Sequence, residues 1–310
     1  MKSLVTGGAG FIGSHLVDAL LERGDDVLVL DDLSSGKREN LSAALQHGAT
    51  LEVLDVTDPR VLLTALEGFG PEAVFHLAAQ IDVRKSMADP GFDARLNVIG
   101  TLNVLEAAAR VGAGRLVFVS TGGAMYGEGV GREDELPFAE SARCEPDSIY
   151  GQSKLAAEGY VGYYDRTHEI STAVVRLGNV YGPRQDPALE AGVVAIFSDL
   201  ARDGGKPTVF GDGLQTRDYI HVTDVVAGIL APPSSAGKGI FNIGTGVETN
   251  VLELAETIGR LAGRENFEPT FAPPRAGEVQ RTALDPTLAE HELGWRAQLS
   301  LEKGLEQTLA

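Results

Sequence analysis

Short runs of consecutive apolar residues alternate, over the first 177 residues, with longer segments whose apolar positions recur every three or four residues. The short runs predict buried strands, and the longer segments predict amphipathic helices. The predicted strands are residues 3–6, 27–30, 51–54, 73–77, 116–120 and 172–177. The predicted helices are residues 11–23, 41–46, 58–66, 86–110 and 149–168. This alternation favours an α/β fold, a Rossmann-like doubly wound parallel sheet with ligands at the carboxyl ends of its strands.

The pattern changes after Leu177, where glycine and proline become more frequent. The helices there are shorter, as at Val193–Arg202 and Val251–Leu261. We therefore predict a dinucleotide-binding domain over residues 1–177 and a smaller C-terminal α/β substrate-binding lobe over residues 178–310.

Two segments of the C-terminal part are more apolar than their surroundings. They are Tyr219–Leu230 and Ile240–Ile243. We expect the chain near residues 219–243 to return to the sheet of the first domain, so the boundary between the domains is not a single point.

The first predicted strand runs into a turn that carries Gly7, Gly10 and Gly13 and opens a helix. In this spacing one glycine permits a tight turn, one lets the backbone approach a pyrophosphate, and one lets the helix pack closely on the strands. The second strand ends at Asp31, where a carboxylate accepts both hydrogen bonds of an adenosine ribose and repels a 2′-phosphate. The arrangement predicts a site for NAD rather than NADP.

Composition excludes several classes of partner. The chain has 44 acidic against 26 basic residues and a formal charge of −18, so nucleic acid and anionic membranes are not expected to bind. No apolar run is as long as a membrane span, and the first strand begins at Ser3, which predicts a cytoplasmic protein without a signal peptide. The single cysteine, Cys144, excludes an intramolecular disulfide, and the histidine spacing predicts no metal site.

Tyr150 and Lys154 are four residues apart at the start of a long predicted helix, so their side chains share one face. A phenol has a pKa of about 10, and keeping it half ionised near neutrality takes roughly 4 kcal/mol. A neighbouring ammonium supplies part of that free energy, and the nicotinamide cation of bound NAD supplies more. We expect Tyr150 to act as general base with Lys154 polarising it.

Two hydroxyl residues, Ser120 and Thr121, end the fifth predicted strand. A hydroxyl at that position can hydrogen-bond the reacting oxygen of a substrate and relay its proton to Tyr150. We favour Thr121, while capping of a turn is a competing role for Ser120. Which of the two supplies the catalytic hydroxyl stays open at this point.

Motifs along nearly the whole chain resemble those of the extended short-chain dehydrogenase/reductase family. They are Thr6–Gly13, His76-Leu77-Ala78-Ala79, Asn97, Tyr150 with Lys154, Arg176–Pro183 and Arg217–Val222. Within the family the likeness is greatest to the 4-epimerases of UDP-glucose and UDP-galactose. It implies that NAD takes a hydride from C4 of a UDP-hexose and returns it to the other face of a transient 4-keto sugar.

The resemblance also implies the roles of individual residues. The adenosine and pyrophosphate of NAD would be bound by Gly7, Gly10, Phe11, Ile12, Asp31 and Asp32, with Asp55 and Val56 beside the adenine. The nicotinamide end would be bound by Leu77, Ala78, Ala79, Asn97, Ser120, Tyr150 and Lys154. The catalytic residues would be Thr121, Tyr150 and Lys154.

The resemblance places the substrate on residues of both predicted domains. They are Thr121, Tyr150, Asn179, Phe210, Arg217 and Arg275. The two arginines would clamp the diphosphate, because the guanidinium fork matches phosphate oxygens. Phe210 would lie at the uracil, and Asn179 at the diphosphate or the sugar. For either arginine alone, a surface salt bridge is an equal alternative.

Gly122 and Gly123 set this chain apart from some members of the family. Many epimerases have serine where alignment back from Tyr126 places Gly122, so here the hydroxyl is expected from Thr121 through a local shift of the backbone. Nucleotide-sugar 4,6-dehydratases and UDP-glucuronate decarboxylases place a carboxylate just after the strand-end hydroxyl. The two glycines cannot supply that carboxylate, which favours epimerisation.

Other functions remain as alternatives. Thr282 aligns near a position where a bulky tyrosine excludes N-acetylated sugars in some epimerases, so UDP-GlcNAc is an alternative substrate. Arg84 would pair with a uronate carboxylate in a UDP-glucuronate 4-epimerase, although we prefer solvent exposure for it. A non-catalytic NAD-binding regulator is the alternative from another class. The resemblance further implies a homodimer formed through Thr101–Arg110 and Ile149–Tyr164.

Overall fold

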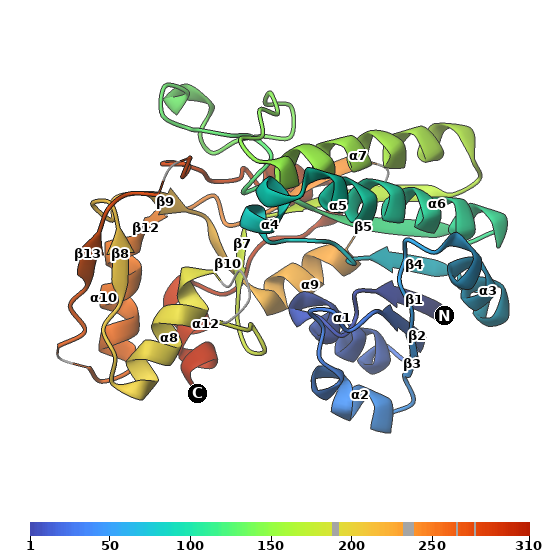
Figure 1. The fold of residues 1–310 in the computed structure, drawn as a ribbon, viewed down its shortest axis with the longest axis horizontal. Helices are drawn as coiled ribbons and strands as arrows, with labels where there is room; N and C mark the ends of the chain where they lie inside the picture. The colour runs from blue at the N-terminus through green and yellow to red at the C-terminus, as the bar shows by residue number, and fades with distance from the viewer. Residues whose placement is uncertain (188–191, 232–238, 265, 276) are drawn as a thin grey trace. The chain divides into compact units, whose positions relative to one another are not determined.

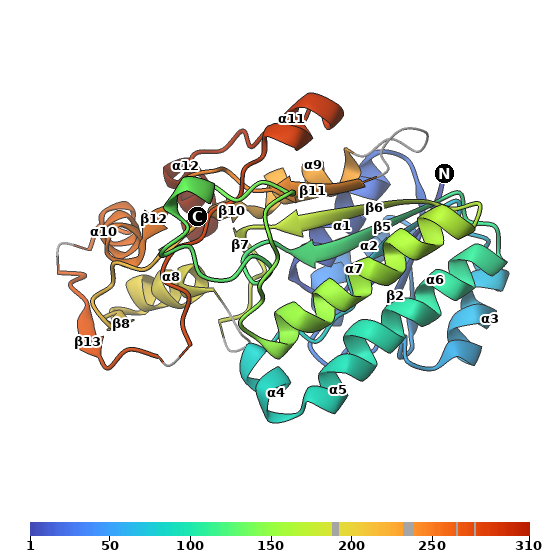
Figure 2. The same cartoon turned by 90° about the horizontal axis from the view of Figure 1, so that it is seen from above.

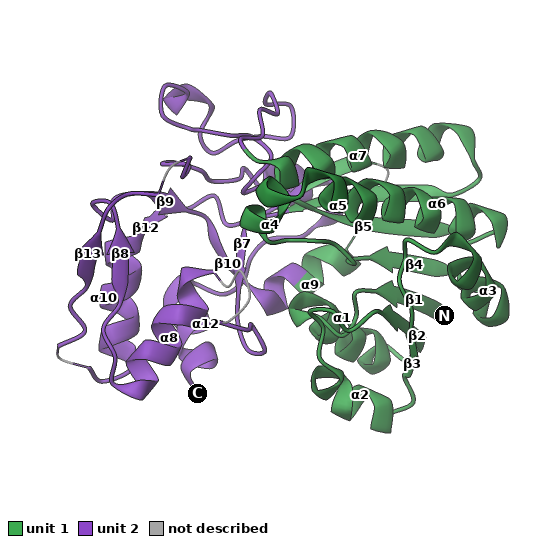
Figure 3. Ribbon diagram, viewed as in Figure 1, with its two compact units in different colours: residues 1–121, 148–176, 226–241 green, residues 122–147, 177–225, 242–310 purple. Residues whose placement is uncertain are grey.

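The computed structural model describes residues 1–187, 192–231, 239–264, 266–275 and 277–310 (Figure 1). The chain divides into two compact units (Figure 3). Unit 1 consists of Met1–Thr121, Ser148–Arg176 and Val226–Phe241. Unit 2 consists of Gly122–Asp147, Leu177–Val225 and Asn242–Ala310.

A seven-stranded sheet forms the centre of unit 1, in the order β11-β6-β5-β4-β1-β2-β3 (Figure 1). Its strands are β1 (Lys2–Thr6), β2 (Asp26–Asp31), β3 (Thr50–Val53), β4 (Ala73–His76), β5 (Arg115–Thr121), β6 (Ser171–Leu177) and β11 (Gly239–Ile243). β1 pairs in parallel with β2 and β4, β2 with β3, and β4 with β5. β2 and β3 lie on one side of β1 in the sheet, and β4, β5 and β6 lie on the other side. The strand order thus reverses at β1, and its carboxyl end is the topological switch point where such sheets bind ligands. The predicted doubly wound Rossmann-like fold is confirmed.

Helices cover both faces of this sheet. They are α1 (Phe11–Glu22), α2 (Ser42–Gln46), α3 (Pro59–Phe69), α4 (Val83–Ala88), α5 (Pro90–Ala94), α6 (Gly100–Arg110) and α7 (Ile149–Thr167), with a 3₁₀ turn at Arg38–Leu41 and a π-helical turn at Arg95–Ile99. α3, α6 and α7 lie side by side on one face, and α1 lies on the other (Figures 1 and 2). Local sequence sets their ends: Asp58 caps α3 by accepting hydrogen bonds from two backbone N–H groups, and Gly70 ends it in the left-handed region.

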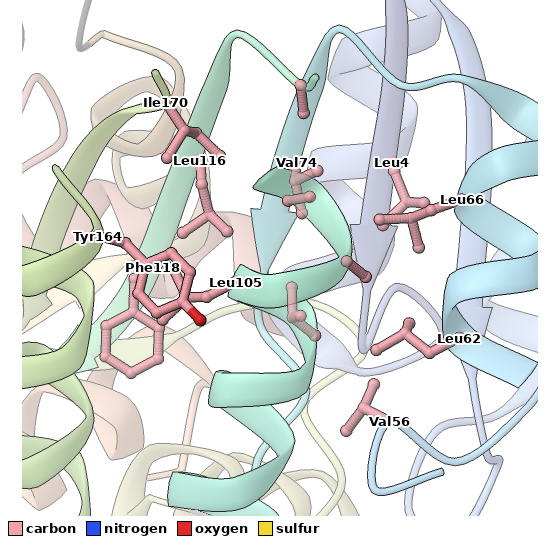
Figure 4. Close-up of a cluster of buried hydrophobic side chains, with 14 of the residues drawn as sticks. Leu4, Val56, Leu62, Leu66, Val74, Leu105, Leu116, Phe118, Tyr164 and Ile170 are labelled. Carbon is pink, nitrogen blue, oxygen red and sulfur yellow. The ribbon is translucent and has the colours of Figure 1, made fainter. Parts of the chain in front are cut away.

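The core of unit 1 fills the space between the sheet and the helices α3, α6 and α7 (Figure 4). Leu4, Val74, Leu116 and Phe118 point into it from the strands, and Leu105 points into it from α6. These side chains are at most 2% exposed. Because burying one such side chain contributes roughly 1.5–3 kcal/mol, this cluster holds the sheet and its helices as one body.

Unit 2 is built from short strands and helices. The strands are β7 (Asn179–Tyr181), β8 (Thr208–Phe210), β9 (Thr216–Arg217), β10 (Tyr219–His221), β12 (Thr249–Asn250) and β13 (Thr270–Ala272). The helices are α8 (Val193–Asp203), α10 (Val251–Leu261), α11 (Thr287–Leu293) and α12 (Leu301–Leu309), with a 3₁₀ turn at Glu133–Glu135, and α9 (Val222–Leu230) runs from unit 2 into unit 1. β7 pairs with β10 and β8 with β13, both in parallel, and β9 pairs antiparallel with β12. The core of the unit includes Phe197, Leu254 and Ile258.

The return of the chain to the sheet differs in part from the expectation. β11 joins the sheet beside β6, whereas Tyr219–His221 forms β10 and pairs with β7 in unit 2. Residues 232–238 of the predicted segment lie outside the described residues. The residues of β10 are buried, as their apolar character predicts. An apolar run therefore indicates burial but does not indicate which strand it pairs with.

The predicted boundary at residue 177 also differs from the division into units at Gly122–Asp147, which belongs to unit 2. Its hydrogen bonds explain the assignment. The Gly122 N–H donates to Leu177 O, the Phe138 N–H donates to Ala283 O, and Phe138 O accepts from the Asp285 N–H. All of these partners are far away in sequence, so local patterning carries no sign of them.

Gly13 offers a test of the turn that opens α1. A Cβ atom on Gly13 would overlap the backbone carbonyl of Gly7, so the helix would have to move away from the turn. We expect Gly13→Ala to lower the free energy of unfolding by about 2 kcal/mol or more, measured by urea unfolding. Gly68→Ala is the matched control, because that helical glycine has open space around it and should gain up to about 1 kcal/mol. Equal stability of the two variants would contradict the packing argument.

Candidate functional site

The glycine turn after β1 has the shape that a pyrophosphate requires. Gly7 has a φ of +70°, and a Cβ there would lie 2.6 Å from the Ala78 nitrogen. Gly10 is the N-cap of α1, and no side chain among the described residues caps the helix. The first N–H groups of α1 and the positive end of its dipole are therefore not used by a capping side chain, which fits the anionic pyrophosphate of NAD.

Asp31 fastens this turn to the end of β2. Its carboxylate accepts hydrogen bonds from the Ala9 and Leu33 N–H groups, both at 2.9 Å, and the residue is 7% exposed. Burial raises the pKa of Asp31, and the two backbone hydrogen bonds lower it. A carboxylate has about four acceptor sites, so each oxygen keeps capacity for a ribose hydroxyl.

The other residues predicted for the adenosine end differ from Asp31 in their surroundings. Asp32 is exposed and accepts hydrogen bonds from the backbone and hydroxyl of Ser34. Asp55 is exposed and accepts from the Thr57 N–H. Val56 is 4% exposed and belongs to the core of unit 1. The structure thus gives Val56 a packing role, and its role beside adenine stays a prediction.

Four buried groups connect the ends of β1 and β4 to the π-helical turn. The Nδ1 atom of His76 is 2.6 Å from the Thr6 hydroxyl, and its Nε2 atom is 3.0 Å from the Thr101 hydroxyl. Thr101 donates its only hydrogen to Asn97 O, so Nε2 must carry the proton of His76. Burial lowers the pKa of His76 to about 3, which keeps the ring neutral. Thr6 therefore donates to Nδ1, and it accepts from the Ala78 N–H at 3.3 Å.

Asn97 is the central polar residue of the π-helical turn and is 1% exposed. Its Oδ1 accepts from the Gln80 N–H at 2.8 Å, and its Nδ2 lies 2.9 Å from Gln80 O. The same Nδ2 lies 3.1 Å from the hydroxyl of Ser153, which precedes Lys154. Leu77, Ala78 and Ala79, on the chain between β4 and Gln80, are half-buried. Asn97 therefore connects this segment to the first turns of α7.

α7 begins with Ser148, whose hydroxyl accepts from the Gly151 N–H, and this cap places Tyr150 in the first turn. Tyr150 is half-buried. Lys154 is 3% exposed, donates to Val119 O at 2.8 Å and lies 4.6 Å over the Phe118 ring. Burial lowers the pKa of Lys154 to about 8, while nearby carboxylates raise it.

The two strand-end hydroxyls are in different surroundings. Ser120 is 3% exposed and donates to the Glu158 carboxylate at 2.6 Å. Thr121 is half-buried at the last position of β5. The hydroxyl hydrogen of Ser120 is thus already used inside the core, and the catalytic role of Thr121 stays a prediction.

Sequence reasoning missed the partner of Ser120. This partner is Glu158, whose carboxylate also forms a bidentate pair with Arg176. The Arg176 guanidinium donates to the two Glu158 oxygens at 2.6, 3.1 and 3.2 Å. Both residues are at most 6% exposed. The sequence spacing could have identified Glu158, because it follows Lys154 by four residues and therefore lies on the same face of α7.

Gly122 and Gly123 pack closely within unit 2. A Cβ on Gly122 would overlap the Leu284 side chain, and a Cβ on Gly123 would lie 3.2 Å from Asn179 Oδ1. A serine at position 122 would therefore require Leu284 to move.

The four residues predicted for the nucleotide of the substrate belong to unit 2. The Arg275 guanidinium lies 4.0 Å over the Phe210 ring, so these two side chains are in contact. Asn179 Oδ1 is buried and has no hydrogen-bond partner among the described residues. A buried amide oxygen without a partner calls for an explanation, and the binding of a ligand by Asn179 stays a prediction.

Arg217 has polar neighbours that the sequence motif did not predict. Its guanidinium donates to Thr216 O at 2.8 Å and lies 3.7 Å from the Glu278 carboxylate. Tyr219 is 6% exposed, and its hydroxyl has no partner within the described chain. Sequence reasoning missed Tyr219 and Glu278, although Tyr219 lies inside the quoted Arg217–Val222 motif.

The histidine, cysteine, aspartate and glutamate side chains of the described residues form no group of three or more that could hold a metal ion. None of the described helices combines the length and the apolar character needed to cross a membrane.

The Glu158–Arg176 pair generates a test of stability. Arg176→Met leaves the Glu158 carboxylate buried with only the Ser120 hydrogen bond, so the free energy of unfolding should fall by about 3–5 kcal/mol. The double variant Glu158→Gln, Arg176→Met also removes the unpaired buried charge, so its free energy of unfolding should fall by less than that of Arg176→Met. Urea unfolding of both variants measures the difference, and a double variant at least as destabilised as the single one would contradict the argument.

Comparisons with known proteins agree with the site. The model of the NAD dependent epimerase/dehydratase family matches residues 3–244. The chain is 45% identical to a UDP-glucose 4-epimerase of Mycolicibacterium smegmatis, over 100% of this chain and 97% of that protein. It is similar to the UDP-glucose 4-epimerase of Thermotoga maritima solved with UDP-glucose (43% identity, TM-score 0.95, 100% and 97% coverage). It is also similar to the Thermus thermophilus UDP-glucose 4-epimerase in complex with NAD (40% identity, TM-score 0.87, 100% and 98% coverage). The chain therefore belongs to the NAD-dependent epimerase/dehydratase family.

Proposed function

We propose that this protein is a NAD-dependent 4-epimerase that interconverts UDP-galactose and UDP-glucose. The observation that carries the proposal is the catalytic turn of α7, where Lys154 is buried one helical turn from Tyr150. The full-length similarity to UDP-glucose 4-epimerases supports the choice of substrate. NAD, when bound, would supply the hydride acceptor and donor.

The residues of unit 1 handle the proton. Lys154 brings a positive charge next to Tyr150, and this charge favours the phenolate over the phenol. Tyr150 then accepts the proton of the C4 hydroxyl, directly or through Thr121, and returns it when the 4-keto sugar is reduced on its other face. Val119 O and the Phe118 ring hold the Lys154 ammonium in place during both steps.

The residues of unit 2 hold the nucleotide in this proposal. Arg217 and Arg275 bind the diphosphate, because guanidinium groups form paired hydrogen bonds to phosphate oxygens. Phe210 contacts the uracil, and Asn179 offers its unpartnered amide oxygen to a donor on the substrate. A firm hold on the nucleotide leaves the sugar free to turn over between the two hydride transfers.

The segment after β5 supports epimerisation over the other reactions of this family. Gly122 and Gly123 bring no carboxylic acid, and their packing against Leu284 and Asn179 leaves little room for one. A 4-epimerase needs no second acid, because the only proton moved belongs to the C4 hydroxyl. Elimination of water would need such a group.

One observation favours a second substrate. Thr282, the residue expected near the N-acetyl group, is small and 2% exposed, so UDP-GlcNAc remains an additional candidate. Arg84 has an exposed side chain whose guanidinium is 3.8 Å from the Asp82 carboxylate, which does not favour a role with UDP-glucuronate. We place the enzyme in the cytoplasm, since a single cysteine leaves no intramolecular disulfide to form outside it.

The purified protein should convert UDP-galactose to UDP-glucose without an added reductant, and UDP-GlcNAc and UDP-glucuronate should be compared in the same assay. Tyr150→Phe should reduce kcat by about 100-fold or more, because the general base is lost. Tyr160→Phe is the matched control, since that tyrosine lies exposed on the same helix. Full turnover by Tyr150→Phe would remove the proposed base. Bound NAD without activity on any UDP-sugar would favour a regulator instead.

We further propose that two copies associate through α7 and the helices beside it. Exposed apolar side chains lie on these helices and on the π-helical turn, and α4, α5, α6 and that turn all contact α7. They are Met87, Phe92, Ile99, Tyr160 and Tyr163. A second copy would remove this apolar surface from water.

Tyr163→Glu should convert the dimer to a monomer in sedimentation velocity experiments, because it places a charge in the apolar surface. Val61→Glu is the control, as Val61 is also exposed but lies on α3. Retention of the dimer by Tyr163→Glu, or its loss in both variants, would contradict an interface on α7.

A further inference from the structure

Asp93 is a buried carboxylate that neither the fold nor the proposed mechanism has used. It lies in α5 and is 0% exposed. Its Oδ1 accepts hydrogen bonds from the Ser86 hydroxyl at 2.6 Å and from Asn97 Nδ2 at 3.1 Å. Its Oδ2 is buried and has no hydrogen-bond partner among the described residues. Such a group is costly to bury, so its presence calls for a compensating interaction.

The charged and titratable groups around Lys154 come from four elements. Tyr150 and Glu158 lie on α7 with Lys154, His76 lies on β4, Arg176 lies on β6, and Asp93 lies on α5. Burial keeps the His76 ring neutral by lowering its pKa to about 3, so it adds no charge.

The two carboxylates in this set are not equivalent. Glu158 is held in a bidentate pair by Arg176, so the pair as a whole carries no net charge. Asp93 forms no ion pair within the described part of the chain, and its charge is not cancelled by a guanidinium. A buried ammonium is stabilised by negative charge nearby, and Asp93 is the one of these two carboxylates that has no guanidinium partner among the described residues.

We propose that Asp93 is a positioning residue of the reaction, which supplies the uncancelled negative charge that keeps the buried Lys154 ammonium protonated. The inference rests on the proposed function, because it assumes that Lys154 must be charged to act on Tyr150. Burial lowers the pKa of Lys154, and Glu158 first and Asp93 second raise it, so the direction of the Asp93 effect agrees with this role.

A chain of hydrogen bonds joins Asp93 to the same turn of α7. Asn97 Nδ2, which donates to Asp93, also lies 3.1 Å from the Ser153 hydroxyl. Ser153 in turn donates to Tyr150 O at 2.9 Å. Asp93 thus has two routes to the catalytic turn, one through charge and one through hydrogen bonds, and a test has to separate them.

The variant Asp93→Asn separates the effect of charge from the effect of the hydrogen bonds, because asparagine keeps an oxygen acceptor and removes the charge. Lys154 has a pKa of about 8, and loss of a nearby negative charge lowers it further. Both enzymes hold a protonated Lys154 at low pH, so they should diverge only as pH rises. We expect the alkaline limb of kcat against pH to move down by roughly 1 pH unit in Asp93→Asn, with KM for UDP-galactose little changed.

Ser86→Ala is the matched control. It removes a hydrogen bond to the same oxygen of Asp93 and leaves the charge in place, so its alkaline limb should coincide with that of the unmodified enzyme. The proposal would be overturned if the alkaline limb lay at the same pH in the unmodified enzyme, Ser86→Ala and Asp93→Asn. It would also be overturned if both variants shifted the limb equally.

Asp93→Glu carries the test if Asp93→Asn does not fold, because it retains the charge. Its alkaline limb should stay at the position of the unmodified enzyme, and a displaced limb would overturn the proposal. An unmodified enzyme that turns over no UDP-sugar would instead refute the proposed function, which is a distinguishable result.

Discussion

Unit 1 has to keep a positive charge inside a protein core. Lys154 is almost fully buried beside the Phe118 ring, where an ammonium without compensation would lose its proton. The surroundings supply what water no longer does: Val119 O accepts a hydrogen bond, and the carboxylates Glu158 and Asp93 oppose the effect of burial on its pKa. The neutral form of His76, fixed by two threonine hydroxyls, avoids a second positive charge. The groups around Lys154 thus compensate for the burial of its ammonium.

The parallel sheet brings these groups together. The carboxyl ends of β1, β4 and β5 meet at one edge, and they contribute Thr6, His76 and Ser120 there. Each of these polar side chains is buried and hydrogen-bonded, so the edge is preorganised before a ligand binds. The turn at the same edge carries Gly7, Gly10 and Gly13, and glycines in this spacing let the backbone approach a pyrophosphate. Cofactor binding and proton transfer therefore share one rigid scaffold.

Unit 2 contains its own buried anchor, Asp218. Its carboxylate is 1% exposed and accepts hydrogen bonds from Thr245, Gly246 and Leu284. Burial raises the pKa of Asp218, and those hydrogen bonds lower it. The anchor fixes Leu284 where it packs against Gly122, and so it shapes the segment that follows β5. Arg217 and Arg275, the arginines proposed for the substrate, are by contrast half-buried and exposed.

The sequence by itself determined the fold class, the family, the glycine turn with Asp31, and the pairing of Tyr150 with Lys154. These features depend on spacing within a strand, a turn or one helix, and local periodicity records such spacing directly. Only the tertiary structure decided that Ser120 donates to Glu158, that Arg176 pairs with Glu158, and that Asp93 Oδ2 is buried with no hydrogen-bond partner among the described residues. It also decided that Tyr219–His221 pairs with β7 and that Gly122–Asp147 belongs to unit 2. These outcomes depend on partners that are distant along the chain, and the physical reason is that burial and charge compensation are properties of the packed molecule, which no local pattern contains.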